Sequence, residues 1–308
     1  MTPESHIQFN KLVDIIIKQN PLQRKRIEKF CEEQGSDYWA FADQLSHRIN
    51  RKILSTEPDL QKGAAAYNKM CMDFLKEQIK FKKSGKYSIA KASIAEENVY
   101  SQLDVMTYYM VGLLISYMLW PNHYKLYEFF LHHLPERPIK NYLEVGVGHG
   151  LFSSTVLDRH PTSHGTGIDI SETSIAIAKQ TLNAFDVSPN RMDFIHSDYM
   201  EADLPHNSFD FIIMGEVLEH VDDAPSFMRQ THKYLAPEGH VYLTTCANCP
   251  ALDHVYHFRR VQEIRDLLNK AGFRIIAESA LPADNVPEEE WEQELTTINY
   301  CCTLTKDH

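Results

Sequence analysis

The first segment whose residue types suggest ligand chemistry is LEVGVGHG, over residues 143–150. It leaves an apolar run and enters a helical pattern, and glycines there let the backbone turn tightly and approach a ligand closely. Leu151 stands where the dinucleotide fingerprint GxGxxG would have its last glycine. Glu144, just before Gly146, suits a cationic amino-acid moiety and would be unfavourable beside a pyrophosphate. The helix N-terminus that follows can still bind a carboxylate.

Two aspartates stand at the ends of the next two apolar runs. Asp169 ends GID, where an acidic side chain can accept hydrogen bonds from both ribose hydroxyls. Asp198, in HSDYM, can accept a hydrogen bond from an adenine amino group. Either aspartate alone could equally cap a helix or a turn. Both of them behind a matching glycine loop favour a nucleoside-binding site.

Several histidines are expected near the same edge, where ligands collect in parallel sheets. His220 follows the apolar run at 209–215, and its alternative role is to bind a loop backbone. The irregular segment CANCPALDHVYHF, over 246–258, follows another such run. A general base is useful when a reaction needs a hydroxyl or an acidic C–H as nucleophile. We therefore take as candidate general bases His220, His254 and His257, and as candidate substrate contacts Asp253, Tyr256, Tyr108 and Tyr109. The two last tyrosines lie on an apolar helix and could pack in the core instead.

The cysteines do not predict a disulfide framework or a metal site. The chain has six cysteines, of which Cys246 and Cys249 form a single CxxC. A zinc site would need a second pair or suitably spaced histidines. His254 and His257 follow closely, but we predict no metal ligands. Free thiols, together with a polar start that does not resemble a signal peptide, predict a cytoplasmic protein.

The elements that must position these residues form two blocks. The first, 1–135, follows a helical pattern throughout and is expected to be an N-terminal cap or dimerisation domain. From Pro138 on, short apolar runs alternate with helical segments, which is typical of a parallel sheet with crossover helices. We therefore expect an α/β fold in which 136–308 form a seven-stranded doubly wound sheet. The expected helices are 5–18, 21–31, 37–53, 59–80, 105–120, 122–133, 171–185, 222–235 and 259–271, with a loop at 80–88; the expected strands are 141–145, 165–170, 192–197, 209–215, 240–245, 273–280 and 298–305, the last two as a hairpin.

The uncharged stretch at 105–120 is too short for a membrane span. It has 16 residues and ends at Pro121, whereas a spanning helix needs about 20 apolar residues. We expect a buried cap helix or a helix at a homodimer interface, and no membrane partner.

The charge balance argues against nucleic acid as a partner. The net charge is −11, and most of the excess acid lies in 136–308, which would repel a phosphate backbone. The first block carries a lysine group: Lys76, Lys80, Lys82, Lys83, Lys86 and Lys91. These lysines form either a solvated helix end and loop or a docking patch for an anionic substrate or an acidic carrier protein.

The glycine loop and the two aspartates, followed by FDFIIMGEVLEHV over 209–221, closely resemble the class I S-adenosylmethionine-dependent methyltransferase family. The resemblance covers about 140–308, and each motif falls on the expected strand end in the expected order. PEG at 237–239 resembles the family's turn before the fifth strand. LLNKAGF at 267–273 resembles a helix end found in many small-molecule members.

This resemblance implies an enzyme that binds S-adenosylmethionine and methylates a small-molecule acceptor, which could be anionic or carrier-bound. O- or C-methylation is favoured over N-methylation. Methyl transfer from a sulfonium is an in-line displacement, so the enzyme chiefly positions donor and acceptor. The implied cofactor-binding residues are Glu144, Gly146, Gly148, Gly150, Asp169, Ile170, Asp198, Tyr199, Gly215 and Glu216. The methyl-transfer side would be lined by Met214, Gly215, Glu216 and His220.

Other readings of the same residues remain open. A nicotinamide-dependent oxidoreductase shares the strand–glycine–helix start, although Leu151 and Asp198 weaken that reading. A protein that binds S-adenosylmethionine without methylating anything would keep the same pocket. A metal-assisted reaction on a 2-oxo acid would need more ligands than His254 and His257 establish.

Overall fold

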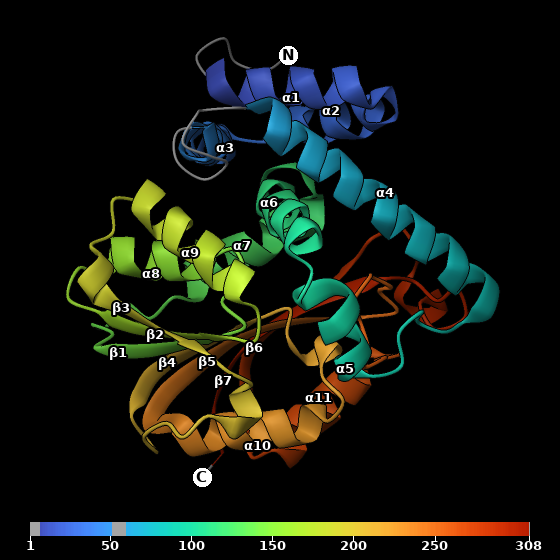
Figure 1. Cartoon of the computed structure of the whole chain (residues 1–308). Coiled ribbons are helices and arrows are strands. Elements are labelled where there is room, and N and C mark those ends of the chain that lie inside the picture. Colours follow the sequence, from blue (N-terminus) through green and yellow to red (C-terminus); the bar gives the residue numbers. More distant parts are fainter. Residues whose placement is uncertain (1–6, 51–59, 308) are drawn as a thin grey trace.

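The computed structural model describes residues 7–50 and 60–307, which form an α/β core with further helices stacked on one side (Figure 1). The core is one seven-stranded sheet with the order β3-β2-β1-β4-β5-β7-β6. Strand β7 runs antiparallel to both of its neighbours, and the other pairs are parallel. This is the predicted doubly wound fold. The strands are β1 (Asn141–Val145), β2 (His164–Asp169), β3 (Met192–His196), β4 (Phe209–Gly215), β5 (Leu235–Ala247), β6 (Phe273–Pro282) and β7 (Ile298–Lys306).

Helices cover both faces of the sheet (Figure 1). One face carries α6 (Leu103–Leu119), α7 (Pro121–His133), α8 (Leu151–Arg159) and α9 (Glu172–Ala184). The other face carries α10 (Ala224–Tyr234) and α11 (Val261–Lys270). A strand covered on both sides can be apolar along its whole length, and β1 is buried from its second residue onward.

The remaining helices are α1 (Ile7–Gln19), α2 (Arg24–Glu32), α3 (Ser36–Arg48), α4 (Leu60–Ser84) and α5 (Ala92–Ala95), the last followed by a π-helical turn, Glu96–Tyr100. Most of them lie beyond α6 in the upper part of Figure 1, whereas α5 lies lower in the view than α6. The predicted ends at 5–6, 51–53 and 59 lie outside the described residues. The predicted loop at 80–88 is wrong in its first half, because α4 continues to Ser84. Its lysines there face solvent while Phe81 is fully buried, so the helix keeps an apolar stripe until Gly85, with a φ of 65°, ends it.

Strand β5 begins earlier than predicted, at Leu235 instead of residue 240. Leu235 pairs with Phe209 and His240 pairs with Phe211, so 236–239 bulge out between two paired positions. The proline and glycine of PEG lie in this bulge, where the ladder does not need their hydrogen bonds.

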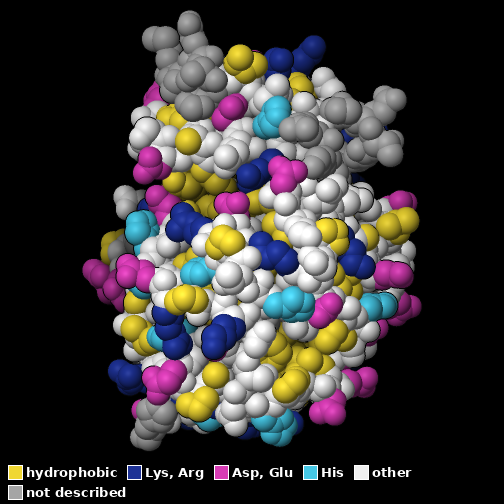
Figure 2. Space-filling model, turned by 90° about the vertical axis from the view of Figure 1, so that its left-hand side faces the viewer, with side chains coloured by type: hydrophobic (Ala, Val, Ile, Leu, Met, Phe, Trp, Pro, Cys, Tyr) yellow, Lys and Arg dark blue, Asp and Glu magenta, His cyan; other side chains and the backbone are white. Residues whose placement is uncertain are grey.

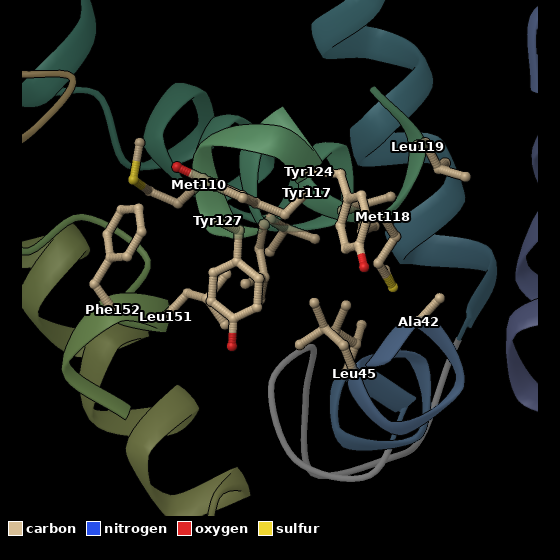
Figure 3. Packing of buried hydrophobic residues seen from close by; sticks show 14 of the residues in the cluster. Ala42, Leu45, Met110, Tyr117, Met118, Leu119, Tyr124, Tyr127, Leu151 and Phe152 are labelled. Atoms are coloured by element: carbon tan, nitrogen blue, oxygen red, sulfur yellow. The ribbon is translucent and has the colours of Figure 1, made fainter. Parts of the chain in front are cut away.

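Helix α6 is buried within the chain. Leu114, Ile115 and Met118 are fully shielded from solvent, and the Tyr38 hydroxyl donates a 2.5 Å hydrogen bond to the Met118 carbonyl. Figure 3 shows side chains of α6 and α7 packed between α8 on one side and α3 on the other. Core packing therefore explains why α6 is apolar on all sides.

Among the described residues, no single helix is long and apolar enough to cross a membrane. Helices α6 and α7 reach that length and composition only together, and they are bent by 81° at their junction.

Several lysines of the predicted patch are already paired. Lys76 and Lys80 lie 2.8 and 2.6 Å from the carboxylates of Asp73 and Glu77, and the Lys82 ammonium donates to the Glu294 carbonyl at 2.7 Å. On the face shown in Figure 2, acidic and basic side chains of the described residues are intermixed. Salt bridges within α4 thus take up part of the charge that suggested a docking patch.

Candidate active site

A deep cavity of about 1350 Å³ opens along the carboxyl edge of the parallel strands. Its sheet side is formed by the turns after β1, β2, β3 and β4, and its other side by α6 and the N-terminal helices. This is the edge at which doubly wound sheets bind ligands. The volume exceeds the range of about 300 to 1,000 Å³ that is usual for one small-molecule site, so two ligands can bind side by side.

The glycine loop after β1 forms one wall of the cavity. Gly146, Gly148 and Gly150 have φ angles of 67°, 49° and 73°, in the left-handed region that favours glycine. A Cβ at Gly146 would lie 2.9 Å from Val217, and one at Gly150 would lie 2.9 Å from the Ala178 backbone. Gly150 is therefore required for the packing of α8 against α9 and does not itself line the cavity.

Glu144 lies at the base of this loop. It is 2% exposed, and one carboxylate oxygen accepts hydrogen bonds from the Ser153 N–H, at 3.1 Å, and from the Ser153 hydroxyl. Burial raises the pKa of Glu144 to about 8, although the Ser153 hydrogen bonds oppose that shift. Glu144 therefore lines the cavity and at the same time accepts a hydrogen bond from the first turn of α8.

Asp169 and Asp198 both line the cavity and also hold backbone in place. Asp169 accepts the N–H groups of Gly148 at 2.9 Å and Ser171 at 2.8 Å, and burial raises its pKa. Asp198 accepts the Met200 N–H at 2.8 Å. Each aspartate therefore binds backbone N–H groups and also lines the cavity. Ile170 and Tyr199 line the cavity beside them.

Glu216, directly after β4, is held in an unusual conformation. Its φ is 54°, left-handed for a non-glycine residue, and its N–H donates to the Thr244 hydroxyl at 2.9 Å. Its Oε1 is buried without a hydrogen-bond partner among the described residues. Burial raises the pKa of Glu216 and of Glu219, and repulsion from Glu216 adds to the rise at Glu219. A cation in the cavity would give the Glu216 carboxylate its missing partner.

His220 belongs to a polar network that joins distant parts of the chain. Its Nδ1 lies 3.0 Å from the Tyr100 hydroxyl, 3.2 Å from the Asp253 carbonyl and 3.4 Å from the Asp253 carboxylate. The Tyr100 and Tyr109 hydroxyls donate to the two Asp253 oxygens at 3.2 and 2.9 Å. All neighbours of Nδ1 are thus acceptors, so Nδ1 carries the proton and Nε2 is free to accept one.

Five of the predicted residues do not line the cavity: Gly150, Met214, Tyr108, Tyr256 and His257. His257 binds the Asn248 side chain at 2.9 Å, and Tyr256 packs against Phe258. Tyr108 donates to Asp73 at 2.9 Å on the outer side of α6. Tyr256 and His257 stay outside the cavity because the loop turns back after His254, where the Asn248 N–H donates to the Phe258 carbonyl at 2.9 Å. His254, Asp253 and Tyr109 do line the cavity.

Sequence reasoning missed other lining residues. Tyr117 and His123 come from the helical block, and His149 comes from the glycine motif itself. Burial lowers the pKa of His123 to about 3 and that of His149 to about 4, so both rings are neutral at neutral pH. The place of His149 in the motif was a usable signal. Tyr100 and Arg26 had none, because only the tertiary fold brings them to the cavity.

A family model described as a methyltransferase domain matches residues 122–278, about half of the chain. The chain belongs to that methyltransferase family. Phosphoethanolamine N-methyltransferase 2 of Caenorhabditis elegans is 26% identical over 44% of this chain and 33% of its own length. Malonyl-[acyl-carrier protein] O-methyltransferase 1 of Ilyobacter polytropus is 30% identical over 44% of this chain and 54% of its own length. The chain thus spans about a third to a half of these relatives.

The fold of this methyltransferase matches a solved structure of Haemonchus contortus phosphoethanolamine N-methyltransferase 2 in complex with S-adenosylmethionine. The TM-score is 0.54 at 12% identity, over 72% of this chain and 61% of the other. The methyltransferase fold of that neighbour thus holds S-adenosylmethionine. The cavity fits this cofactor: the Glu216 oxygen lacks the partner that a cationic ammonium or sulfonium would supply, and a Cβ at Gly148 would meet no atom closer than 3.6 Å.

Proposed function

We propose that this methyltransferase transfers the methyl group to a small-molecule acceptor that is enclosed between the glycine loop and the N-terminal helices. The cavity of about 1350 Å³ carries this proposal, because it is lined both by the glycine loop and by residues of α2, α4 and α6; we call the part lined by these helices the second chamber. That second chamber is roofed by helices, which suits a small acceptor better than a macromolecular surface.

The cofactor side of the cavity has the donors and acceptors that S-adenosylmethionine needs. When bound, the cofactor supplies an electrophilic methyl group on a sulfonium. We assign the ribose to Asp169, the adenine to Asp198 with Ile170 and Tyr199, and the amino-acid end to the glycine loop with Glu144. Gly215 ends β4, Glu216 follows it, and both line the cavity, where the Glu216 carboxylate would stabilise the sulfonium.

His220 is our proposed general base. The acceptors around Nδ1 hold the ring in one tautomer, and Asp253 is placed to stabilise the imidazolium that forms. A base of this kind is needed for a hydroxyl or an acidic C–H, and it is less necessary for an amine that is already nucleophilic. The network therefore supports O- or C-methylation over N-methylation.

We further propose that the acceptor carries an anionic group. Arg26 and Lys29 of α2 line the cavity together with Glu33, and the two positive charges would attract an anion. The names of the two relatives contain a phosphate ester and a malonyl group, both of which are anionic. A carrier-bound acid would enter by the same route, with its carrier outside.

The two parts of the chain, 1–135 and 136–308, are proposed to have different roles. We propose that 1–135 act as the cap that closes the acceptor chamber and that 136–308 hold the cofactor. Helix α6 is largely shielded within its own chain, with Leu103 in its first turn 65% exposed, so its apolar character does not require the expected homodimer. The dimer stays a prediction, which light scattering on the purified chain checks.

The first experiment is calorimetric titration with S-adenosylhomocysteine, repeated on Asp169→Ala and Gly148→Val. We expect micromolar binding by the wild type and its loss in both variants. Asp169→Ala removes the carboxylate that would accept hydrogen bonds from the ribose hydroxyls, and Gly148→Val puts a side chain into the space that the cofactor would occupy beside the glycine loop. Folded wild-type protein that binds nicotinamide cofactors instead would refute the assignment.

Turnover is tested next with labelled S-adenosylmethionine and a panel of small acids, phenols and amines. Transfer that depends on His220 supports the proposal. Tight cofactor binding without transfer to any acceptor, including the metabolites of a cell extract, would favour a non-methylating binding protein.

A further inference from the structure

The end of β5 carries a side-chain cluster that the methyl-transfer proposal does not use. Cys246, Cys249 and His254 each present one ligand atom, and these atoms lie within 4.8 Å of one another. We call these three residues the thiol cluster. Cys246 is fully buried, whereas Cys249 and His254 line the second chamber of the cavity. The cluster therefore has a closed side in the protein and an open side toward the chamber.

The spacing inside the thiol cluster suits a tetrahedral metal. The Cys246 sulfur lies 3.7 Å from His254 Nδ1. In a tetrahedral zinc site, bond lengths near 2.3 Å to sulfur and 2.0 Å to nitrogen place those two atoms roughly 3.6 Å apart. In the structure, the ring N–H also faces the Cys249 carbonyl at 2.6 Å. Metal binding would shift that proton to Nε2.

The loop that carries the ligands is fixed by its own backbone. Asn248 has a φ of 50°, which turns the chain sharply between the two cysteines. Its N–H donates to the Phe258 carbonyl at 2.9 Å, and its carbonyl accepts from the Thr297 hydroxyl at 2.7 Å. The Cys249 N–H donates to the Tyr87 hydroxyl at 3.0 Å. Ligands on a fixed loop bind a metal without ordering it first.

A second, independent observation points to a cation here. Glu219 is fully buried, and its Oε1 has no hydrogen-bond partner among the described residues. A carboxylate oxygen of Glu219 lies within 4.8 Å of ring nitrogens of His254 and His220. A carboxylate oxygen of Glu219 also lies within 4.8 Å of the Cys246 sulfur and of the Glu216 carboxylate. A metal at the thiol cluster would give this buried carboxylate the positive neighbour that it lacks.

We propose that Cys246, Cys249 and His254 bind one soft divalent metal ion, such as zinc, in the wall of the second chamber. Two thiolates and one imidazole are a ligand set that zinc prefers. Three protein ligands leave the fourth position open toward the chamber, which is the arrangement of catalytic zinc sites. A water molecule or a heteroatom of a bound molecule would complete the tetrahedron. This site does not depend on the methyl-transfer proposal.

The test uses the reduced full-length protein and zinc chloride, in competition with a chromophoric chelator. We expect one zinc per chain, lost in Cys249→Ser and in His254→Gln. Cys71→Ser is the matched control, because Cys71 lines the same cavity outside the thiol cluster and should leave zinc binding unchanged.

Cobalt in place of zinc gives a direct readout on the wild type. Intense visible bands of tetrahedral cobalt, with a thiolate charge-transfer band, are expected; this keeps the proposal testable if a variant fails to fold. Reduced wild-type protein that takes up no stoichiometric zinc, or that only forms a Cys246–Cys249 disulfide, would overturn it. Titration of the same samples with S-adenosylhomocysteine reports on the cofactor site separately.

Discussion

Replacing Glu144 with glutamine should remove a pH-dependent loss of stability. Glu144 is almost fully shielded, and among the described residues it accepts hydrogen bonds from the N–H and the hydroxyl of Ser153. Burial raises its pKa from 4.5 to about 8. Glutamine has nearly the same shape, can accept the same hydrogen bonds and cannot ionise, so it isolates the charge.

The sign and size follow from proton linkage. Below pH 4.5 the carboxyl is protonated in both the folded and the unfolded chain and has no effect. Between pH 4.5 and about 8 the unfolded chain releases the proton while the folded chain keeps it, so the stability of the wild type falls as pH rises. Above that range the loss is complete. At about 1.4 kcal/mol per pH unit, it amounts to roughly 2 to 5 kcal/mol.

The assay is urea unfolding of wild type and Glu144→Gln, without ligand, at about pH 5, 7 and 9. The free energy of unfolding of the variant should exceed that of the wild type by an amount that grows across this range. Glu201→Gln, which removes an exposed acid in the turn after β3, is the control and should show a constant difference. A constant difference for Glu144→Gln as well would refute the reasoning, because the carboxyl would then ionise as easily folded as unfolded.

Three further outcomes test the active-site proposal. Asp253→Asn should lower kcat by about 10² or more while S-adenosylhomocysteine still binds, because His220 loses the carboxylate that orients it; a change confined to KM would instead make Asp253 a substrate contact. Arg26→Gln should raise KM for an anionic acceptor several-fold and leave KM for a neutral analogue unchanged, as steady-state kinetics on the two acceptors would show. Asp198→Ala should weaken S-adenosylhomocysteine binding about tenfold by calorimetry, consistent with one lost hydrogen bond to a charged group; unaltered affinity would limit Asp198 to its cap on Met200.

The sequence alone determined the sheet and the side of the cavity that is formed by the glycine loop, Asp169 and Asp198. Strand β1 is a short, mostly apolar run that contains Glu144, and Gly146 and Gly148 need left-handed backbone, so both features follow from local residue type. Asp169 and Asp198 were predictable for the same reason, because Asp169 ends strand β2 and Asp198 comes two residues after strand β3. The extent of α4 was harder to predict, since three surface lysines hid the buried Phe81 that continues its apolar stripe.

Only the tertiary structure decided the acceptor side. Tyr100 meets Asp253 across 153 residues of sequence, a distance over which no periodicity carries information. Within 246–258 every side chain was a plausible contact, and the turn at Asn248 with its return to Phe258 decided that His254 faces the cavity and His257 does not. Strand patterns are set by neighbours along the chain, whereas the lining of a cavity is set by which helices and loops pack together over it.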